Sequence, residues 1–212
     1  SAETQQRLIS QSDPDILQRD VSDLVLAAQA WGTPLTKLDL LTQPRKVQLD
    51  TAYKKLQSLG VLDANMVITP HGRDVLQMPL DIRLAHMFLI TDARWPGAGE
   101  RLTAAAWVAA HLGDIGRSSS DNLEENIRFK IHQSDKRFWS DVTRFLHNSN
   151  GVQQPVPSNL ISVELLAQSV SLAYPDWVAR RQTAEGYKLA NGKRVTLNSN
   201  SPLGKHPWLA IA

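Results

Sequence analysis

Cationic side chains gather near the end of the chain. Residues 174–212 contain six Lys and Arg against two Asp and Glu, whereas residues 1–173 contain 17 against 19. Lys and Arg bind phosphate groups, and the release of counterions makes their binding to nucleic acid sensitive to salt. We therefore expect phosphate contacts from five of these residues, with Tyr187 as a candidate for base stacking. A solvated charged surface is the alternative for this set: Arg180, Arg181, Lys188, Lys193 and Arg194.

Two further sets of cations precede this segment. The first lies in an expected helical bundle and faces either a nucleic-acid channel or solvent: Arg128, Lys130, Lys136 and Arg137. The second surrounds an expected helix near the N-terminus: Arg45, Lys46, Lys54 and Lys55. Residues 1–60 contain seven cations and seven anions, so their charges cancel. A solvated face or a docking surface therefore explains the second set better than a helix that enters a groove of nucleic acid.

The sequence lacks the motifs that bind a nucleoside triphosphate. It has no G-x-x-x-x-G-K-[ST] phosphate loop and no Asp-Glu-Ala-His motif, so the residues that would hold nucleotide and Mg²⁺ are missing. There is no cysteine, and the six histidines have no metal-ligand spacing. His86 fits a core position better than a ligand, and Glu124 and Glu125 fit a helix start better than acid–base catalysis. We expect no catalytic residue, no cofactor and no ATP hydrolysis by this chain alone.

Composition is typical of a soluble globular protein, with 42% hydrophobic and 21% charged residues. No apolar run is long enough to span a membrane, and the N-terminus lacks a signal-peptide pattern. Together with the absence of cysteine, this favours a cytoplasmic protein without a membrane partner. The chain starts at Ser1 rather than methionine and stops within an apolar run, so we expect a piece of a longer protein.

Residues 1–78 show the pattern of a winged helix. The expected elements are a helix of about five turns from the cap Ser12 to Gly32, a second helix from 46 to Gly60, two short strands within 61–69, and a short helix capped by Thr69. The two strands flank a turn at Ala64-Asn65.

Residues 79–173 show repeated helical periodicity. The expected helices lie at 82–90, 102–113, 121–131, 138–146 and 158–173, with a long loop at 148–158. Asp121 and Glu124 have the spacing of a capping box. The helix after Asp81 is apolar on most sides, which predicts the core of this part.

Residues 174–212 change to a strand-like pattern. Two short runs flank Asn191-Gly192, which predicts a hairpin, and Trp208–Ile211 offers a third strand. We therefore predict a mainly α fold with three domains: a winged helix at 1–78, a helical bundle at 79–173, and a short β hairpin or partial barrel at 174–212.

Several sequence runs resemble the region that follows the second motor domain in DEAH-box ATP-dependent RNA helicases. They are SDPDIL at 12–17, LQSLGVLD at 56–63, TPHGR at 69–73 and PLDIRLAHM at 79–87. Two later runs, LAYPD at 172–176 and YKLANGK at 187–193, resemble the HrpB type. The resemblance covers nearly the whole chain and is weakest from 116 to 154.

The resemblance implies a winged helix, a ratchet-like helicase-associated bundle and the start of an OB-like domain, all beside the nucleic-acid channel. It implies single-stranded RNA or DNA and the helicase's own motor domains as partners, with ATP and Mg²⁺ bound by the motor. The leading hypothesis is an accessory fragment that guides single-stranded nucleic acid and couples its movement to the motor. The alternatives are a stand-alone winged-helix DNA-binding protein and a protein-docking module.

Overall fold

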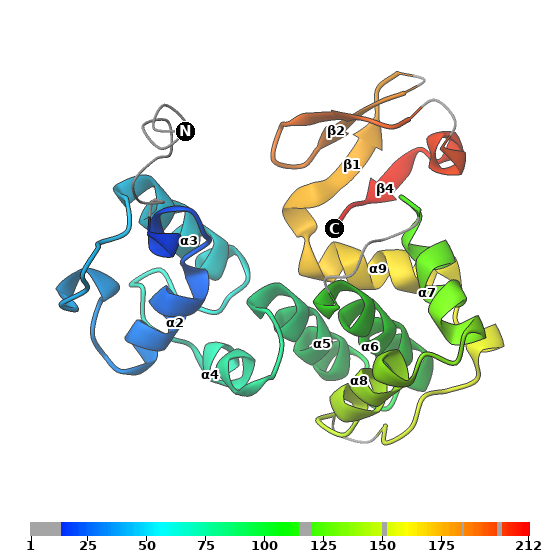
Figure 1. Cartoon of the computed structure of the whole chain (residues 1–212), viewed down its shortest axis with the longest axis horizontal. Coiled ribbons are helices and arrows are strands. Elements are labelled where there is room, and N and C mark those ends of the chain that lie inside the picture. The colour runs from blue at the N-terminus through cyan, green and yellow to red at the C-terminus, as the bar shows by residue number, and fades with distance from the viewer. Residues whose placement is uncertain (1–13, 115–119, 150–151, 184, 199–200) are drawn as a thin grey trace, which may run out of the picture. The chain divides into compact units, whose positions relative to one another are not determined.

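The computed structural model describes residues 14–114, 120–149, 152–183, 185–198 and 201–212. Its internal contacts divide the chain into two compact units, residues 1–78 and 79–212. The described residues are mainly helical and end in a small antiparallel sheet, so the predicted fold class is confirmed (Figure 1). None of the described helices is both long and apolar enough to cross a membrane. The predicted boundary at residue 173 stays a prediction.

The first unit consists of short helices around one apolar core. Its elements are the 3₁₀ turn η1 (Asp15–Leu17), α2 (Ser22–Ala30), the 3₁₀ turn η2 (Leu35–Lys37), α3 (Lys46–Ser58) and α4 (Pro70–Gln77). Helices α2 and α3 pack together through fully buried side chains such as Val25, Leu26 and Leu56. The helix predicted from residue 46 is confirmed, and Gly60 follows its end with a φ of 65°.

The first helix is shorter than the predicted five turns. Ser12, its predicted cap, lies outside the described residues, and the turn η1 is separated from α2 by a break. Asp20 causes this break, because its carboxylate accepts hydrogen bonds from the backbone amide and the hydroxyl of Ser22 at 2.8 and 2.5 Å. A side-chain acceptor of this kind starts a helix, and here it starts α2 after the apolar periodicity has already begun.

The predicted hairpin within 61–69 is reduced to one β bridge between Leu62 and Ile68. The carboxylate of Asp63 accepts the backbone amides of Asn65 and Val67, each at 2.8 Å. Met66 between them has a φ of 64°. Because Asp63 holds these amides in a tight loop, they are not free to extend a two-stranded ladder.

Helix α4 begins as the sequence predicts. The hydroxyl of Thr69 accepts the amide of Gly72 at 3.0 Å, and Pro70 occupies the first turn. A Cβ at position 72 would lie 2.3 Å from the carbonyl oxygen of Val61. Only glycine therefore allows this helix to approach the preceding segment so closely.

The second unit is a helical bundle joined to a sheet. Its helices are α5 (Ile82–Arg94), α6 (Gly99–Gly113), α7 (Leu123–His132), α8 (Lys136–Leu146) and α9 (Val163–Ala173), with the 3₁₀ turns η3 (Ser158–Leu160), η4 (Pro175–Trp177) and η5 (Pro202–Lys205). Helix α6 is buried without a break from Leu102 to Ala110 and packs against α5, α8 and α9. The core therefore centres on α6 rather than on α5 alone.

Two predicted helix starts are wrong by a few residues. Asn122, not Asp121, caps α7, because its side-chain oxygen accepts the amide of Glu124 at 3.0 Å. Helix α9 begins after Ser162, whose hydroxyl accepts the amide of Leu165 at 3.4 Å, and not at residue 158. The 3₁₀ turn η3 occupies the place where the sequence suggested the first turn of that helix.

The sheet has four antiparallel strands in the order β3-β2-β1-β4. They are β1 (Val178–Arg181), β2 (Gly186–Leu189), β3 (Arg194–Thr196) and β4 (Trp208–Ala210). The predicted hairpin and third strand are confirmed, but the prediction missed β1, the strand that joins them. The hairpin loop is also longer than two residues: the Gly192 amide donates to the Leu189 carbonyl at 2.9 Å, and Gly192 has a φ of 88°.

One face of the sheet is buried, with Ala179, Tyr187 and Leu189 at its centre. Helix α9 contacts β4 and lies beside the sheet in Figure 1. An ion pair further ties the sheet to the bundle: the Arg83 guanidinium donates to both carboxylate oxygens of Asp176, at 2.8 and 3.2 Å. It also donates to the carbonyl of Ala173 at 3.1 Å, so the start of α5 holds the segment that leads into β1.

Candidate nucleic-acid interface

The register of the sheet aligns three cations and a tryptophan in a row across all four strands. Arg194 of β3 lies opposite Lys188 of β2, and Lys188 lies opposite Arg180 of β1. Arg180 in turn lies opposite Trp208 of β4. Directly opposite residues point to the same face of a sheet, and all four side chains are exposed. We call Arg194, Lys188 and Arg180 the cationic row.

The cationic row places like charges side by side. The amide of Leu189 donates to the carbonyl of Lys193 at 2.9 Å, so the adjacent pair Lys188 and Arg194 is of the non-hydrogen-bonded kind, in which side chains lie closest. Like charges directly opposite each other destabilise a sheet. Within the described ranges, no cation of the row forms an ion pair with a carboxylate. The row is therefore an unneutralised positive strip suited to a bound anion.

Trp208 ends the row on the edge strand β4. The amide of Arg181 donates to the carbonyl of Pro207 at 2.9 Å, which makes Arg180 and Trp208 a second close, non-hydrogen-bonded pair. The Arg180 guanidinium carbon lies over the indole, 5.6 Å from the ring centroid. Trp208 nevertheless remains 58% exposed. An aromatic ring beside an unneutralised cation can accept a flat, electron-rich group.

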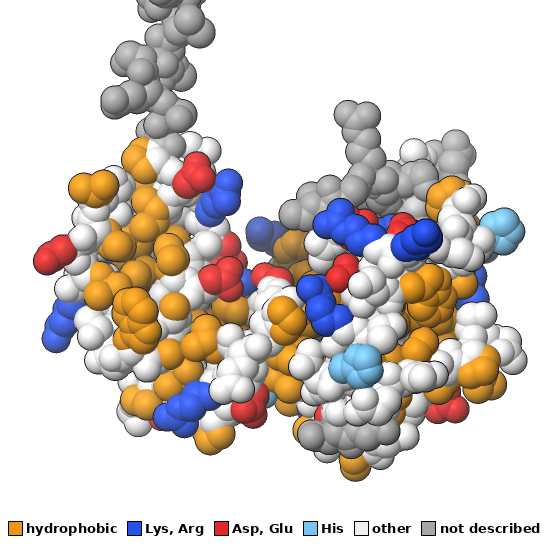
Figure 2. All heavy atoms as spheres, turned by 60° about the horizontal axis from the view of Figure 1, so that its bottom comes forward, with side chains coloured by type: hydrophobic (Ala, Val, Ile, Leu, Met, Phe, Trp, Pro, Cys, Tyr) orange, Lys and Arg blue, Asp and Glu red, His pale blue; other side chains and the backbone are white. Residues whose placement is uncertain are grey.

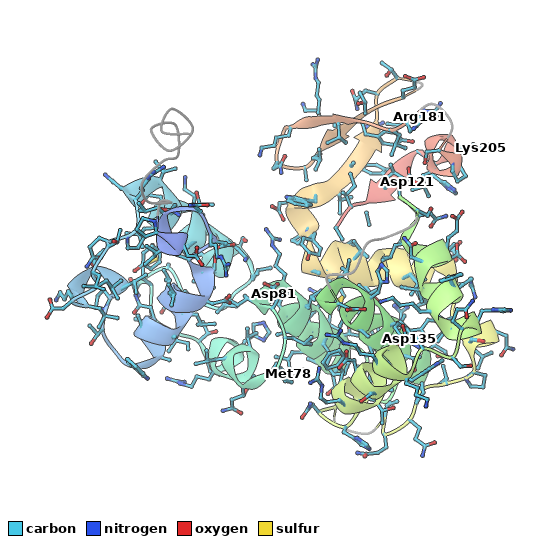
Figure 3. The ribbon with its side chains drawn as sticks, viewed as in Figure 1. Met78, Asp81, Asp121, Asp135, Arg181 and Lys205 are labelled. Carbon is cyan, nitrogen blue, oxygen red and sulfur yellow. The ribbon has the colours of Figure 1, made fainter. Side chains whose placement is uncertain are left out.

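The other predicted residues of the sheet lie outside the row. Arg181 is exposed near the end of β1 (Figure 3), and its Nε donates to the carbonyl of Thr183 at 3.1 Å. Lys193 is exposed in the loop after Gly192. Tyr187, the expected stacking residue, is only 1% exposed, and its hydroxyl donates to the carbonyl of His206 at 2.8 Å. The prediction of a stacking role for Tyr187 is therefore wrong.

Three of the four predicted cations of the bundle are engaged with neighbours, and the fourth, Lys136, is exposed at the start of α8. Arg128 pairs with Glu124 at 2.8 Å and also donates to a backbone carbonyl of the loop before α9. Lys130 pairs with Asp114 at 2.8 Å, with only 18% of its side chain exposed. The hydrogen bond from Lys130 is the main reason that the pKa of Asp114 lies below its ordinary value. Arg137 also approaches Asp114, at 3.4 Å. These charges are largely neutralised within the chain.

The cations of the first unit also differ from the row. Lys55 pairs with Asp20 at 2.9 Å and keeps only 12% of its side chain exposed. Lys46 and Lys54 are exposed on α3, as a solvated helix face requires. The structure thus brings together three of the seven residues predicted most directly to bind nucleic acid, all in the sheet. The seven are Arg128, Lys130, Arg180, Arg181, Lys188, Lys193 and Arg194.

Potential metal ligands do not cluster among the described residues. No group of three or more His, Asp or Glu side chains there is placed to hold a metal ion. A shallow groove follows α8, lined by residues such as Lys136, Trp139, Arg144 and His147. Arg144 is already paired with Asp141 at 2.7 Å, so this groove has less free charge than the sheet.

The chain resembles known RNA helicases. No protein-family model matches it. It is 30% identical over 209 residues to the ATP-dependent RNA helicase HrpB of Escherichia coli, an alignment that covers 98% of the chain and 24% of that protein. It is 32% identical over 136 residues to the probable ATP-dependent RNA helicase DHR1 of Saccharomyces cerevisiae, covering 59% of the chain and 10% of that relative.

The fold agrees with this similarity. A crystal structure of the E. coli DExH-box NTPase HrpB superposes with a TM-score of 0.76 and 28% identity, over 99% of the chain and 24% of that structure. A second crystal structure, of the E. coli DEAH/RHA helicase HrpB, gives a TM-score of 0.76 and 29% identity, over 98% of the chain and 25% of that structure. The chain therefore corresponds to about a quarter of these relatives. Over nearly its whole length, it resembles a part of the HrpB type of DEAH-box helicases, the family that its sequence motifs predict.

Proposed function

We propose that the chain is an accessory part of an ATP-dependent RNA helicase of the HrpB type. In this role it guides single-stranded nucleic acid past the motor domains and contributes no catalytic residue. ATP and Mg²⁺ would be bound by motor domains of the longer, cytoplasmic protein. The similarity to RNA helicases supports the class, and the cationic row carries the proposed contact with nucleic acid.

A single strand fits the row better than a duplex does. Proteins that bind single strands without sequence preference combine a positive surface that follows the phosphates with exposed aromatic rings. Arg194, Lys188 and Arg180 supply the positive surface on an exposed sheet face, and no recognition helix is involved. Such a site predicts weak, sequence-tolerant and strongly salt-dependent binding.

The link between the sheet and the bundle supports the coupling part of the proposal. Arg83, with only 15% of its side chain exposed, holds Asp176 by two hydrogen bonds. The Arg83 guanidinium also lies 5.1 Å from the centre of the Tyr174 ring. A nucleic-acid strand that is pulled across the sheet would therefore act on the start of α5 through the partly buried contact between Arg83 and Asp176.

The first unit suits a protein-docking role within the same helicase. Its charges nearly balance, with eight Lys and Arg against nine Asp and Glu, and Trp31 and Val47 are 81% and 75% exposed. Figure 2 shows hydrophobic side chains gathered over one face of this unit. Exposed apolar surface of this kind marks protein contacts, and the proposed partner is the motor of the longer protein.

Fluorescence anisotropy with a labelled uridine oligomer at low salt tests the proposal. The double variant Lys188→Glu/Arg194→Glu removes two phosphate contacts, so we expect weaker binding and a salt slope smaller by about 1.4, at roughly 0.7 per contact for single strands. The matched double variant Lys46→Glu/Lys54→Glu makes the same charge change on α3 and should bind as the wild type does. Equal binding by all three proteins, or none by the wild type, would refute the proposal.

The same variants distinguish this proposal from the rival hypothesis of a stand-alone winged-helix DNA-binding protein. A stand-alone winged-helix protein would prefer duplex DNA and would lose that preference when Lys46 and Lys54 are reversed. The proposal predicts instead that single-stranded RNA competes better than duplex DNA of the same length, and that the α3 variant does not change this order.

A further inference from the structure

Trp208 has no evident role in folding. The apolar face of the sheet is built from Ala179, Tyr187 and Leu189, with Leu209 packed against it. Successive residues of a strand alternate between faces, so Trp208 lies on the face opposite this core, and it is 58% exposed. Large aromatic rings normally bury most of their surface. A single exposed ring is ordinary on a protein surface, but Trp208 stands beside the cationic row, which makes it a candidate for binding a flat ligand.

Arg180 contacts the indole and leaves more than half of Trp208 exposed. The two residues form a close cross-strand pair, with the guanidinium 5.6 Å from the ring centroid. This contact restricts the ring and places a positive charge over one of its faces. The exposed area that remains is available for a flat partner.

We propose that Trp208 stacks on an unpaired base while the cationic row holds the neighbouring phosphates. Because adjacent strands lie about 4.8 Å apart, the row from Arg194 to Trp208 spans about 14 Å across three strand spacings. The nucleic acid therefore runs at a large angle to the β-strands instead of along one of them, and its stacked base lies at β4. This inference rests on the proposed function and adds the base-binding element that Tyr187 does not supply.

The test compares oligomers with and without bases on the full chain. The variant Trp208→Ala should weaken binding of a uridine oligomer by about 5- to 150-fold, the range expected for one base–aromatic stack. An abasic oligomer of equal length should bind wild type and Trp208→Ala equally. Trp208→Phe should keep most of the affinity, and Phe129→Ala, a change of an equally exposed aromatic ring on α7 (60% exposed), should have no effect. A deoxyuridine oligomer in parallel shows whether RNA or DNA is preferred, because it differs from the uridine oligomer in the sugar alone.

The outcomes separate the inference from the proposed function. If Trp208→Ala binds both oligomers as the wild type does, or loses both equally, the stacking role is wrong while the phosphate role stands. Absence of binding by the wild type overturns both. Competition by polyglutamate as effective as that by uridine oligomer would also overturn the inference, since it would identify an acidic peptide as the ligand. Amide hydrogen exchange of the sheet checks that each variant is folded. If Trp208→Ala is not folded, the binding of Trp208→Phe to the two oligomers provides the readout.

Discussion

Reversing the middle charge of the cationic row should stabilise the sheet while it weakens binding. In Lys188→Glu, the carboxylate lies between Arg180 and Arg194, so two repulsive cross-strand pairs become two attractive ones. Each such pair contributes about 0.2–1 kcal/mol. Because the side chains are exposed and screened by solvent, we expect a gain of about 0.5–1.5 kcal/mol in the free energy of local opening.

Amide hydrogen exchange measures the free energy of local opening within the sheet, and this measurement does not depend on the stability of the first unit. The Ala190 amide donates to Val178 and the Arg181 amide donates to Pro207, each at 2.9 Å. Exchange at both amides reports opening of the sheet, and a gain of that size should slow it by about 2- to 10-fold at low salt. At about 1 M salt, where the Debye length falls to about 3 Å, the difference should largely vanish.

Lys205→Glu is the matched control, because it makes the same charge change on η5, outside the four strands. It should leave the two exchange rates near those of the wild type. Faster amide exchange in Lys188→Glu than in the wild type would show that like-charge repulsion does not destabilise the cationic row. Slowing of the exchange that persists unchanged at high salt would show the same.

Two further variants test the contacts that position the interface and the first unit. Arg83→Met leaves the partly buried carboxylate of Asp176 unpaired, so we expect the free energy of local opening of the sheet to fall by about 1–3 kcal/mol. The same amide exchange measures this change. Unchanged protection would show that the ion pair does not hold the sheet. Gly72→Ala puts a Cβ 2.3 Å from a backbone oxygen and should destabilise the first unit by about 1–3 kcal/mol in urea unfolding. Gly113→Ala, where a Cβ meets nothing within 4 Å, should unfold as the wild type does, and equal loss in both variants would contradict the packing argument.

The helical part of the fold was largely predictable because apolar periodicity and caps are local signals. Thr69 and Asp81 cap α4 and α5 as the sequence indicates, with each side chain accepting a backbone amide. The errors occurred where a second polar residue competed for the same role. Asp20 interrupts the first helix, and Asn122 replaces Asp121 as the cap of α7. Such choices depend on side-chain direction, which periodicity does not contain.

The interface was predictable as a set of residues but not as an arrangement. The charge count identified Arg180, Lys188 and Arg194, yet strand β1 was too short and too polar to be recognised. Without β1 there was no register, and without register Trp208 had no connection to the cations. The period-2 alternation that buries Tyr187 was visible in the hairpin and could have excluded it as a stacking residue.

Photo-crosslinking of the chain to an oligomer that contains 4-thiouridine, followed by mass spectrometry of the peptides, tests whether single-stranded RNA lies across the sheet of the second unit. We expect adducts within residues 178–210, centred on Trp208 and the strands of the cationic row, and their loss in Lys188→Glu/Arg194→Glu. Adducts confined to α3, or to the groove along α8, would contradict it.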